Sequence, residues 1–138
     1  MQFLKRLIKP VYAHCDVPCG IYETDTMRHA ADTCVRMIEK IEALPDSVGG
    51  KSEAHNNFVR AVATKDKHAQ LCKDQIYVIW SDFLKPEHLE KFPNLHEVMW
   101  QAAKQCSKVK QTVSLDEAKK LAELVAEVDK LFKDVKAL

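Results

Sequence analysis

The sequence predicts an all-α protein, an antiparallel up-down-up-down four-helix bundle that is preceded by a short N-terminal hook. First, the 138 residues include only three glycines, which leaves few of the tight turns that β-hairpins require. Second, apolar residues recur every three or four positions in four separate stretches, and no partner strand is evident elsewhere. Third, the connections between these stretches are fairly short, which favours antiparallel neighbours.

Composition indicates one soluble globular domain. Hydrophobic residues make up 46% of the chain and charged residues 30%. The net charge of +1 gives no footprint for nucleic acid, and no run of about 18 apolar residues exists to cross a membrane. We therefore expect neither nucleic acid nor a membrane as a partner. Five cysteines cannot all pair internally, which favours free or metal-bound thiols in a reducing compartment, the cytoplasm.

The first 13 residues are basic and partly apolar, and we favour a short leader over a secretion signal. Three basic residues and Pro10 interrupt the apolar run that such a signal needs. We expect residues 1–13 to be a leader that a processing protease removes. The domain then covers residues 14–138, with the hook at 14–22 and the helical bundle at about 24–136.

The first predicted helix begins at Thr24 or Asp25, either of which can cap it, and ends near Leu44-Pro45. Its apolar stripe comprises Met27, Ala31, Cys34, Ile38 and Ile41. The spacing of this stripe places all five side chains on one helical face.

The second predicted helix begins near Ser52 and runs to about Leu84, with a polar interruption at Lys65-Asp66. Its stripe comprises Phe58, Val62, Ala69, Cys72, Ile76, Ile79 and Phe83. The run Ile76–Trp80 has the local propensity of a buried strand. We favour a helix there, because the rest of the chain offers no partner strand.

Residues 85–93 form a proline-bounded connection, in which Pro86 can open a helical turn. The third helix carries the stripe Leu95, Val98, Met99, Ala102, Cys106 and Val109. Ser114 and Glu117 fit a capping box at the start of the fourth helix. Its stripe is Ala118, Leu121, Val125, Val128, Phe132 and Val135. Three apolar residues lie off the stripes, as ordinary exposed groups or as subunit contacts: Trp80, Trp100 and Leu124.

The hook, His14–Tyr22, reads His-Cys-Asp-Val-Pro-Cys-Gly-Ile-Tyr and holds two thiols and an imidazole within six residues. A single Cys-x-x-x-Cys is a weaker zinc signal than two Cys-x-x-Cys knuckles, and it lacks the spacing of a redox pair. Taken alone, such a pair is more often structural or incidental than catalytic.

Removal of the leader changes this interpretation. His14 then offers an α-amine and an imidazole, Cys15 offers a backbone nitrogen and a thiolate, and Cys19 offers a second thiolate. Two nitrogens and two sulfurs can form a plane, with the imidazole left for an axial position. A tetragonal site of this kind suits Ni(II) or Cu(II), so the sequence predicts a metal-binding hook.

At these residues the chain resembles the nickel-containing superoxide dismutases. The segment His14–Tyr22 is similar to the nickel-binding hook of that family. A second segment, Trp80–Pro86 with its continuation through Pro93, is similar to the family's Trp-Ser-Asp-(aromatic)-x-Lys-Pro stretch. The resemblance covers essentially the whole chain.

The resemblance implies a superoxide dismutase with one nickel ion per subunit, which cycles between Ni(II) and Ni(III) and converts superoxide to oxygen and hydrogen peroxide. The ligands would be the His14 amine and imidazole, the Cys15 amide nitrogen and the Cys15 and Cys19 thiolates. Tyr22 would order the approach of superoxide, and Asp16 would shape the hook together with a cis-proline. The family fold is a four-helix bundle assembled as a homohexamer.

The chain departs from the family pattern at the axial imidazole. In some members an acidic residue supports this imidazole and pairs with a basic residue; the corresponding positions here are Ala30 and His68. A rival interpretation is a nickel or copper carrier that binds metal without turnover. We expect the remaining cysteines to be small core residues and the other histidines to be surface or hydrogen-bonding groups.

Overall fold

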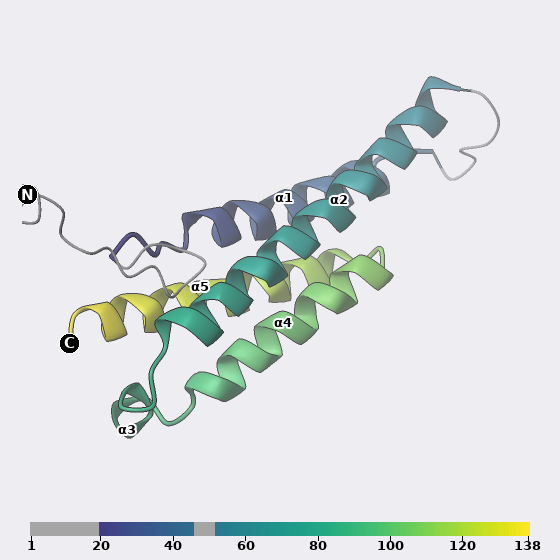
Figure 1. Ribbon diagram of the computed structural model, residues 1–138. Coiled ribbons are helices and arrows are strands. Elements are labelled where there is room, and N and C mark those ends of the chain that lie inside the picture. The colour runs from purple at the N-terminus through teal and green to yellow at the C-terminus, as the bar shows by residue number, and fades with distance from the viewer. Residues whose placement is uncertain (1–19, 46–51) are drawn as a thin grey trace, which may run out of the picture.

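The computed structural model describes residues 20–45 and 52–138, and in this part of the chain the predicted antiparallel four-helix bundle is confirmed (Figure 1). The four long helices are α1 (Asp25–Glu42), α2 (Glu53–Val78), α4 (Leu95–Gln111) and α5 (Leu115–Lys136). Helices α1 and α4 each pack against both α2 and α5, which closes the bundle. None of the helices in the described ranges is long and apolar enough to cross a membrane.

The predicted apolar stripes form the core. Every stripe residue of α1, α4 and α5 is buried, and so are four stripe residues of the second predicted helix, Ala69, Cys72, Ile76 and Ile79. The cysteines at 34, 72 and 106 are fully buried free thiols, which confirms their assignment as small core residues. Burial raises the pKa of the Cys34 thiol to about 12, so this thiol stays protonated at neutral pH.

Helix α2 does not stop at Val78 but continues as a π-helical turn, η2 (Ile79–Phe83). The Leu84 N–H donates to the Ile79 carbonyl at 3.1 Å, and the backbone then becomes extended at Leu84. The preference for a helix over a strand at Ile76–Trp80 is therefore confirmed. Single π-turns are rare and are frequent at functional sites, so this end of the bundle is of interest.

The C-terminal end of α1 and the N-terminal end of α2 extend beyond α4 and α5 (Figure 1). Phe58 and Val62, which were predicted as stripe residues, are only partly buried here, and Val59 is half exposed. The periodicity is helical as expected, but no third or fourth helix covers this stretch. Among the predicted stripe residues of α2, full burial therefore begins only at Ala69.

Lys65 was interpreted as part of a polar interruption, and the structure gives it a different role. Its side chain is only 2% exposed, and Nζ donates to the carbonyls of Val109, Lys110 and Thr112 at 2.7, 2.9 and 3.0 Å. The last carbonyls of a helix have no partner within that helix. Lys65 supplies these partners from α2, with Asp66 Oδ1 at 3.1 Å from its Nζ, and so ties α2 to the end of α4.

The helix boundaries after the second helix agree with the sequence. A one-turn helix, α3 (His88–Lys91), follows Pro86 as expected. At the start of α5, the Ser114 hydroxyl accepts from the Glu117 N–H at 3.3 Å, which confirms one half of the capping box. The Glu117 carboxylate bonds to α4 instead of completing that box: it accepts from Gln105 and forms an ion pair with Lys108, each at 2.7 Å.

Candidate metal centre

The predicted ligands His14, Cys15 and Cys19, together with Asp16, lie outside the described residues. The description begins at Gly20, where φ is +94°. Only glycine adopts such a φ without a steric cost, which explains a glycine at this position of the hook. Within residues 20–45 and 52–138, no group of three histidine, cysteine or acidic side chains is placed to hold a metal ion.

Tyr22 is the predicted site residue that the structure does place. It is 7% exposed, and its ring lies 5.5 Å from the ring of Phe83 at a tilt of 56°. Phe83 in turn contacts the rings of Phe132 at 4.7 Å and His88 at 6.1 Å. The end of the hook is therefore held by an aromatic cluster from η2, α3 and α5.

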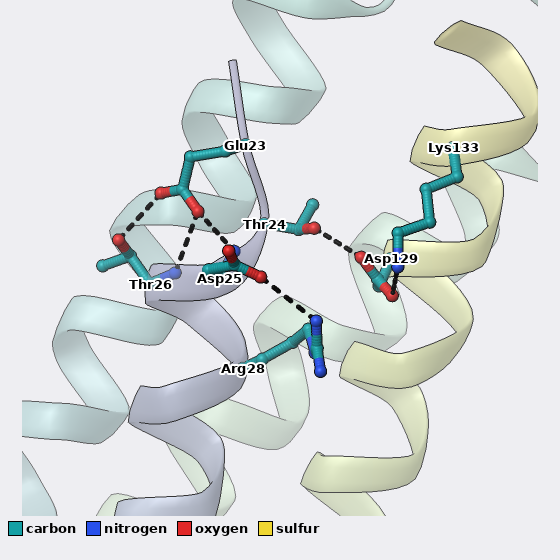
Figure 2. Close-up of polar contacts among 7 residues, drawn as sticks. All are labelled: Glu23, Thr24, Asp25, Thr26, Arg28, Asp129 and Lys133. Atoms are coloured by element: carbon teal, nitrogen blue, oxygen red, sulfur yellow. Dashed lines mark hydrogen bonds and ion pairs between the residues drawn. The ribbon is translucent and has the colours of Figure 1, made fainter. Parts of the chain in front are cut away.

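A second attachment lies two residues further along the chain. Thr24 is 4% exposed, and its hydroxyl donates to Asp129 Oδ1 on α5 at 2.5 Å (Figure 2). Lys133 donates to the other oxygen, Asp129 Oδ2, at 2.7 Å. Partial burial acts to raise the pKa of Asp129, but these two hydrogen bonds outweigh it and hold the pKa below its usual range. The segment that follows the hook is thus fixed to α5 by a charged network.

The start of α1 corrects one sequence interpretation. Neither Thr24 nor Asp25 caps the helix with its side chain. The cap comes from Glu23, whose carboxylate accepts from the backbone N–H groups of Asp25 and Thr26 (Figure 2). The Thr24 hydroxyl is directed at α5 instead, because a buried hydroxyl beside a carboxylate forms the stronger, charge-assisted bond. Asp25 forms an ion pair with Arg28 at 3.1 Å.

Two hydrogen bonds join the second sequence segment, Trp80–Pro86, to the helices that follow it. The Trp80 indole donates to His96 Nδ1 at 2.8 Å, and the Lys85 N–H donates to His88 Nδ1 at 3.1 Å. These two bonds join η2 and its exit to α3 and α4. Between them lies Asp82, whose Oδ1 accepts from the Ser81 hydroxyl at 2.9 Å. Asp82 Oδ2 is buried and has no hydrogen-bond partner in the described part of the chain.

Comparison with known proteins identifies the family. The family model described as nickel-containing superoxide dismutase matches residues 9–136, which include the hook, the bundle and the second segment. The chain belongs to the nickel-containing superoxide dismutase family. The hook and the second segment, which the sequence analysis singled out, both lie within the range that matches the family.

Relatives of similar length support this assignment. The chain is 34% identical over 136 residues to the nickel superoxide dismutase of Streptomyces coelicolor and 33% identical to that of Streptomyces seoulensis, covering 96% of this chain and 98% of each relative. A crystal structure of a nickel-containing superoxide dismutase, with nickel ligation corresponding to the oxidised state, superposes with a TM-score of 0.78 at 31% identity. That match covers 91% of this chain and all of the other. A native structure at 1.30 Å gives a TM-score of 0.77 at 32% identity, over 89% of this chain and 99% of the other.

The two positions at which the sequence analysis expects a departure from the family pattern, Ala30 and His68, are both in the described bundle. Ala30 is buried on α1 and has no polar side-chain atom. His68 is partly buried on α2, and its Nδ1 bonds to the Thr64 carbonyl of its own helix at 2.8 Å.

Sequence reasoning missed the groups on α5 that hold the hook segment. Asp129 lies next to the buried stripe residue Val128 and four residues before Lys133. From the sequence, Asp129 and Lys133 are expected to form an ordinary exposed i,i+4 ion pair. Its partner Thr24 is 105 residues away. Phe132 was predicted as a core residue, and its contact with Phe83 is a tertiary feature that periodicity alone does not give.

Proposed function

We propose that this chain disproportionates superoxide to oxygen and hydrogen peroxide at a nickel ion held by His14, Cys15 and Cys19, with one ion per subunit. The observation that carries the proposal is the family match over residues 9–136, which includes these three residues and Tyr22. The donor set fits the metal, because thiolate, imidazole and amine nitrogen are ligands that nickel accepts.

Nickel supplies the one-electron chemistry, cycling between Ni(II) and Ni(III), and the side chains supply the setting. The thiolates of Cys15 and Cys19 donate charge to the metal and favour its higher oxidation state. Tyr22, fixed by Phe83, presents a phenol at the base of the hook and orders the approach of the small anion. Asp16 shapes the hook. A confined approach also limits oxidation of the two thiolates by peroxide.

The α-amine of His14 exists only if residues 1–13 are removed, so the proposal includes processing by a protease. A chain that still begins at Met1 lacks the amine ligand and is expected to be inactive.

The proposed assembly is a homohexamer in the cytoplasm. The exposed apolar side chains Val59 and Trp100, 50% and 51% exposed, are available for contacts between subunits. The free thiols of the core are compatible with a reducing compartment. Sedimentation of the purified protein tests the assembly, and localisation of a C-terminally tagged chain tests the compartment.

The test of function is nickel content and superoxide consumption, measured together on a chain that begins at His14. We expect about one nickel per chain and turnover in this form, and no turnover in the Met1 form. Cys15→Ser and Cys19→Ser should each abolish both. Cys34→Ala is the matched control, because it removes a core thiol that is not a ligand. Nickel or copper bound without turnover would instead identify a metal carrier.

A further inference from the structure

Phe83 is partly buried and has ring contacts with three separate segments of the chain. Its ring lies 4.7 Å from the ring of Phe132, 5.5 Å from that of Tyr22 and 6.1 Å from that of His88. Phe132 and Tyr22 are buried, whereas His88 on α3 is only partly buried. Phe83 therefore has two partners in the core and one that lies nearer the surface, where packing alone restrains a side chain less.

The His88 ring is fixed by a reciprocal pair of hydrogen bonds with Lys85. The His88 N–H donates to the Lys85 carbonyl at 3.0 Å, and the Lys85 N–H donates back to His88 Nδ1 at 3.1 Å. The pair resembles a capping box, in which a side chain reaches back to a backbone N–H three residues earlier. A ring that accepts from the backbone is held in one orientation, so the imidazole is a fixed neighbour for Phe83.

The restraint on Phe83 extends to Tyr22. Tilted ring pairs at these separations attract one another beyond the apolar area that they bury. Phe83 is the ring that contacts Tyr22 in the described part of the chain, so a shift of Phe83 changes the position of the phenol. Within residues 20–45 and 52–138, His88 has no ring contact with Tyr22 itself, and its effect on Tyr22 therefore passes through Phe83.

We propose that His88 is a positioning residue for Tyr22, acting through the ring of Phe83. The inference rests on the proposed function, in which Tyr22 orders the approach of superoxide. It gives the one-turn helix α3 a role in the reaction, because the first residue of α3 sets the aromatic support of Tyr22.

The test follows Tyr22 directly in metal-free protein. The chain that begins at His14 holds two tyrosines, Tyr22 and Tyr77, so fluorotyrosine labelling gives two fluorine NMR signals, and Tyr77→Phe identifies them. Loss of the ring in His88→Leu should move the Tyr22 signal toward its position in Phe83→Leu and leave the Tyr77 signal in place. In nickel-loaded protein, superoxide consumption should fall about two- to tenfold, the range that one aromatic contact supplies, while nickel content stays unchanged.

Two variants separate the ring of His88 from its hydrogen bond. His88→Asn keeps an acceptor near the position of Nδ1 and removes the ring, whereas His88→Phe keeps a ring and removes the acceptor. We expect the Tyr22 signal to move further in His88→Asn than in His88→Phe, because the ring contact is what restrains Phe83. The unfolding midpoint is measured for each variant, because a merely structural role would lower it without a selective shift of the Tyr22 signal. If His88→Leu does not fold, His88→Asn, which keeps the turn, provides the same test.

His96→Leu is the matched control. His96 Nδ1 also accepts from a donor on the second segment, the Trp80 indole at 2.8 Å, but its ring does not contact Phe83 in the described structure. The Tyr22 signal and superoxide consumption of this variant should therefore stay close to those of the parent chain.

The outcomes separate this inference from the proposed function. An unmoved Tyr22 signal in His88→Leu overturns the inference, and so does a shift in His88→Asn that is no larger than in His88→Phe. An equal shift in His96→Leu also overturns it, because the effect would then be a general loosening of η2. A parent chain that binds no nickel or consumes no superoxide contradicts the proposed function instead. The fluorine signals of the metal-free protein still decide the role of His88 in that case.

Discussion

The Thr24 hydroxyl donates to Asp129 Oδ1 at 2.5 Å, although the two residues are 105 positions apart. Thr24 immediately precedes α1 and follows the hook by two residues, and Asp129 lies near the end of α5. Lys133 completes the network on the second carboxylate oxygen (Figure 2). The start of the first helix and the last helix of the bundle are therefore joined just after the end of the hook.

Replacing Thr24 by valine tests this attachment. Thr24→Val keeps the shape and removes the donor, so the free energy of unfolding should fall by about 1–3 kcal/mol. Nickel loss from the loaded protein should also become faster. Denaturant unfolding and chelator competition measure the two effects. Thr33→Val is the control, because the Thr33 hydroxyl donates to the carbonyl of His29 on its own helix and joins no other helix in the described structure. An equal loss in that variant would contradict the role of the attachment.

The free energy of unfolding should decrease at acidic pH because Asp129 becomes protonated. The folded state holds the pKa of this carboxyl below its usual range, so its contribution is present above the unfolded pKa of about 4. That contribution is lost as the pH falls through the lowered folded pKa. The free energy of unfolding should therefore decrease below about pH 4, and Asp129→Asn should flatten this decrease. The pKa of Glu117 is also lowered, chiefly by its hydrogen bond to Lys108, and this residue contributes in the same direction. The free energy of unfolding of Asp129→Asn should therefore still decrease somewhat with falling pH.

Lys65 should be needed for the packing of α2 against α4. Lys65→Met keeps most of the aliphatic chain and removes the ammonium that serves three carbonyls. We expect a loss of about 2–4 kcal/mol in the free energy of unfolding, because buried acceptors are left without donors. Thermal and denaturant unfolding measure the loss. Lys73→Met is the control. Lys73 donates to the Ser107 hydroxyl at the edge of the same interface and lies over the Tyr77 ring, and its loss should cost about 1 kcal/mol or less.

Phe83 should control the activity that depends on Tyr22. Phe83→Leu removes the ring between Tyr22 and Phe132 and leaves an apolar side chain in place. Superoxide consumption should fall several-fold while nickel content stays near one per chain, because the phenol loses its support and the ligands do not. Phe92→Leu is the control, as Phe92 packs at the edge of the same core and has no ring contact with Tyr22 in the described structure. Equal losses of activity in both variants would show a general packing effect.

Most of the fold was predictable, and its exceptions have physical causes. Periodicity located the helices, since burial of one face imposes a 3.6-residue repeat on any amphipathic helix. The errors concern polar residues with distant partners. Lys65 interrupts the apolar pattern but is buried, because the end of α4 supplies three acceptors. Thr24 is suited to a cap but bonds to α5, and Glu23 caps the helix instead.

For the candidate site, the sequence by itself determined the donor chemistry. Two thiols and a histidine within six residues define what the hook can bind, and the family match agrees with that reading. Only the tertiary structure decided what surrounds the base of the hook: the Tyr22–Phe83 contact, the Thr24–Asp129 bond and the unsatisfied oxygen of Asp82. The physical reason is that ligand identity is a local property of the chain. The support of a site depends instead on which side chains the closed bundle brings together from residues far apart in the sequence.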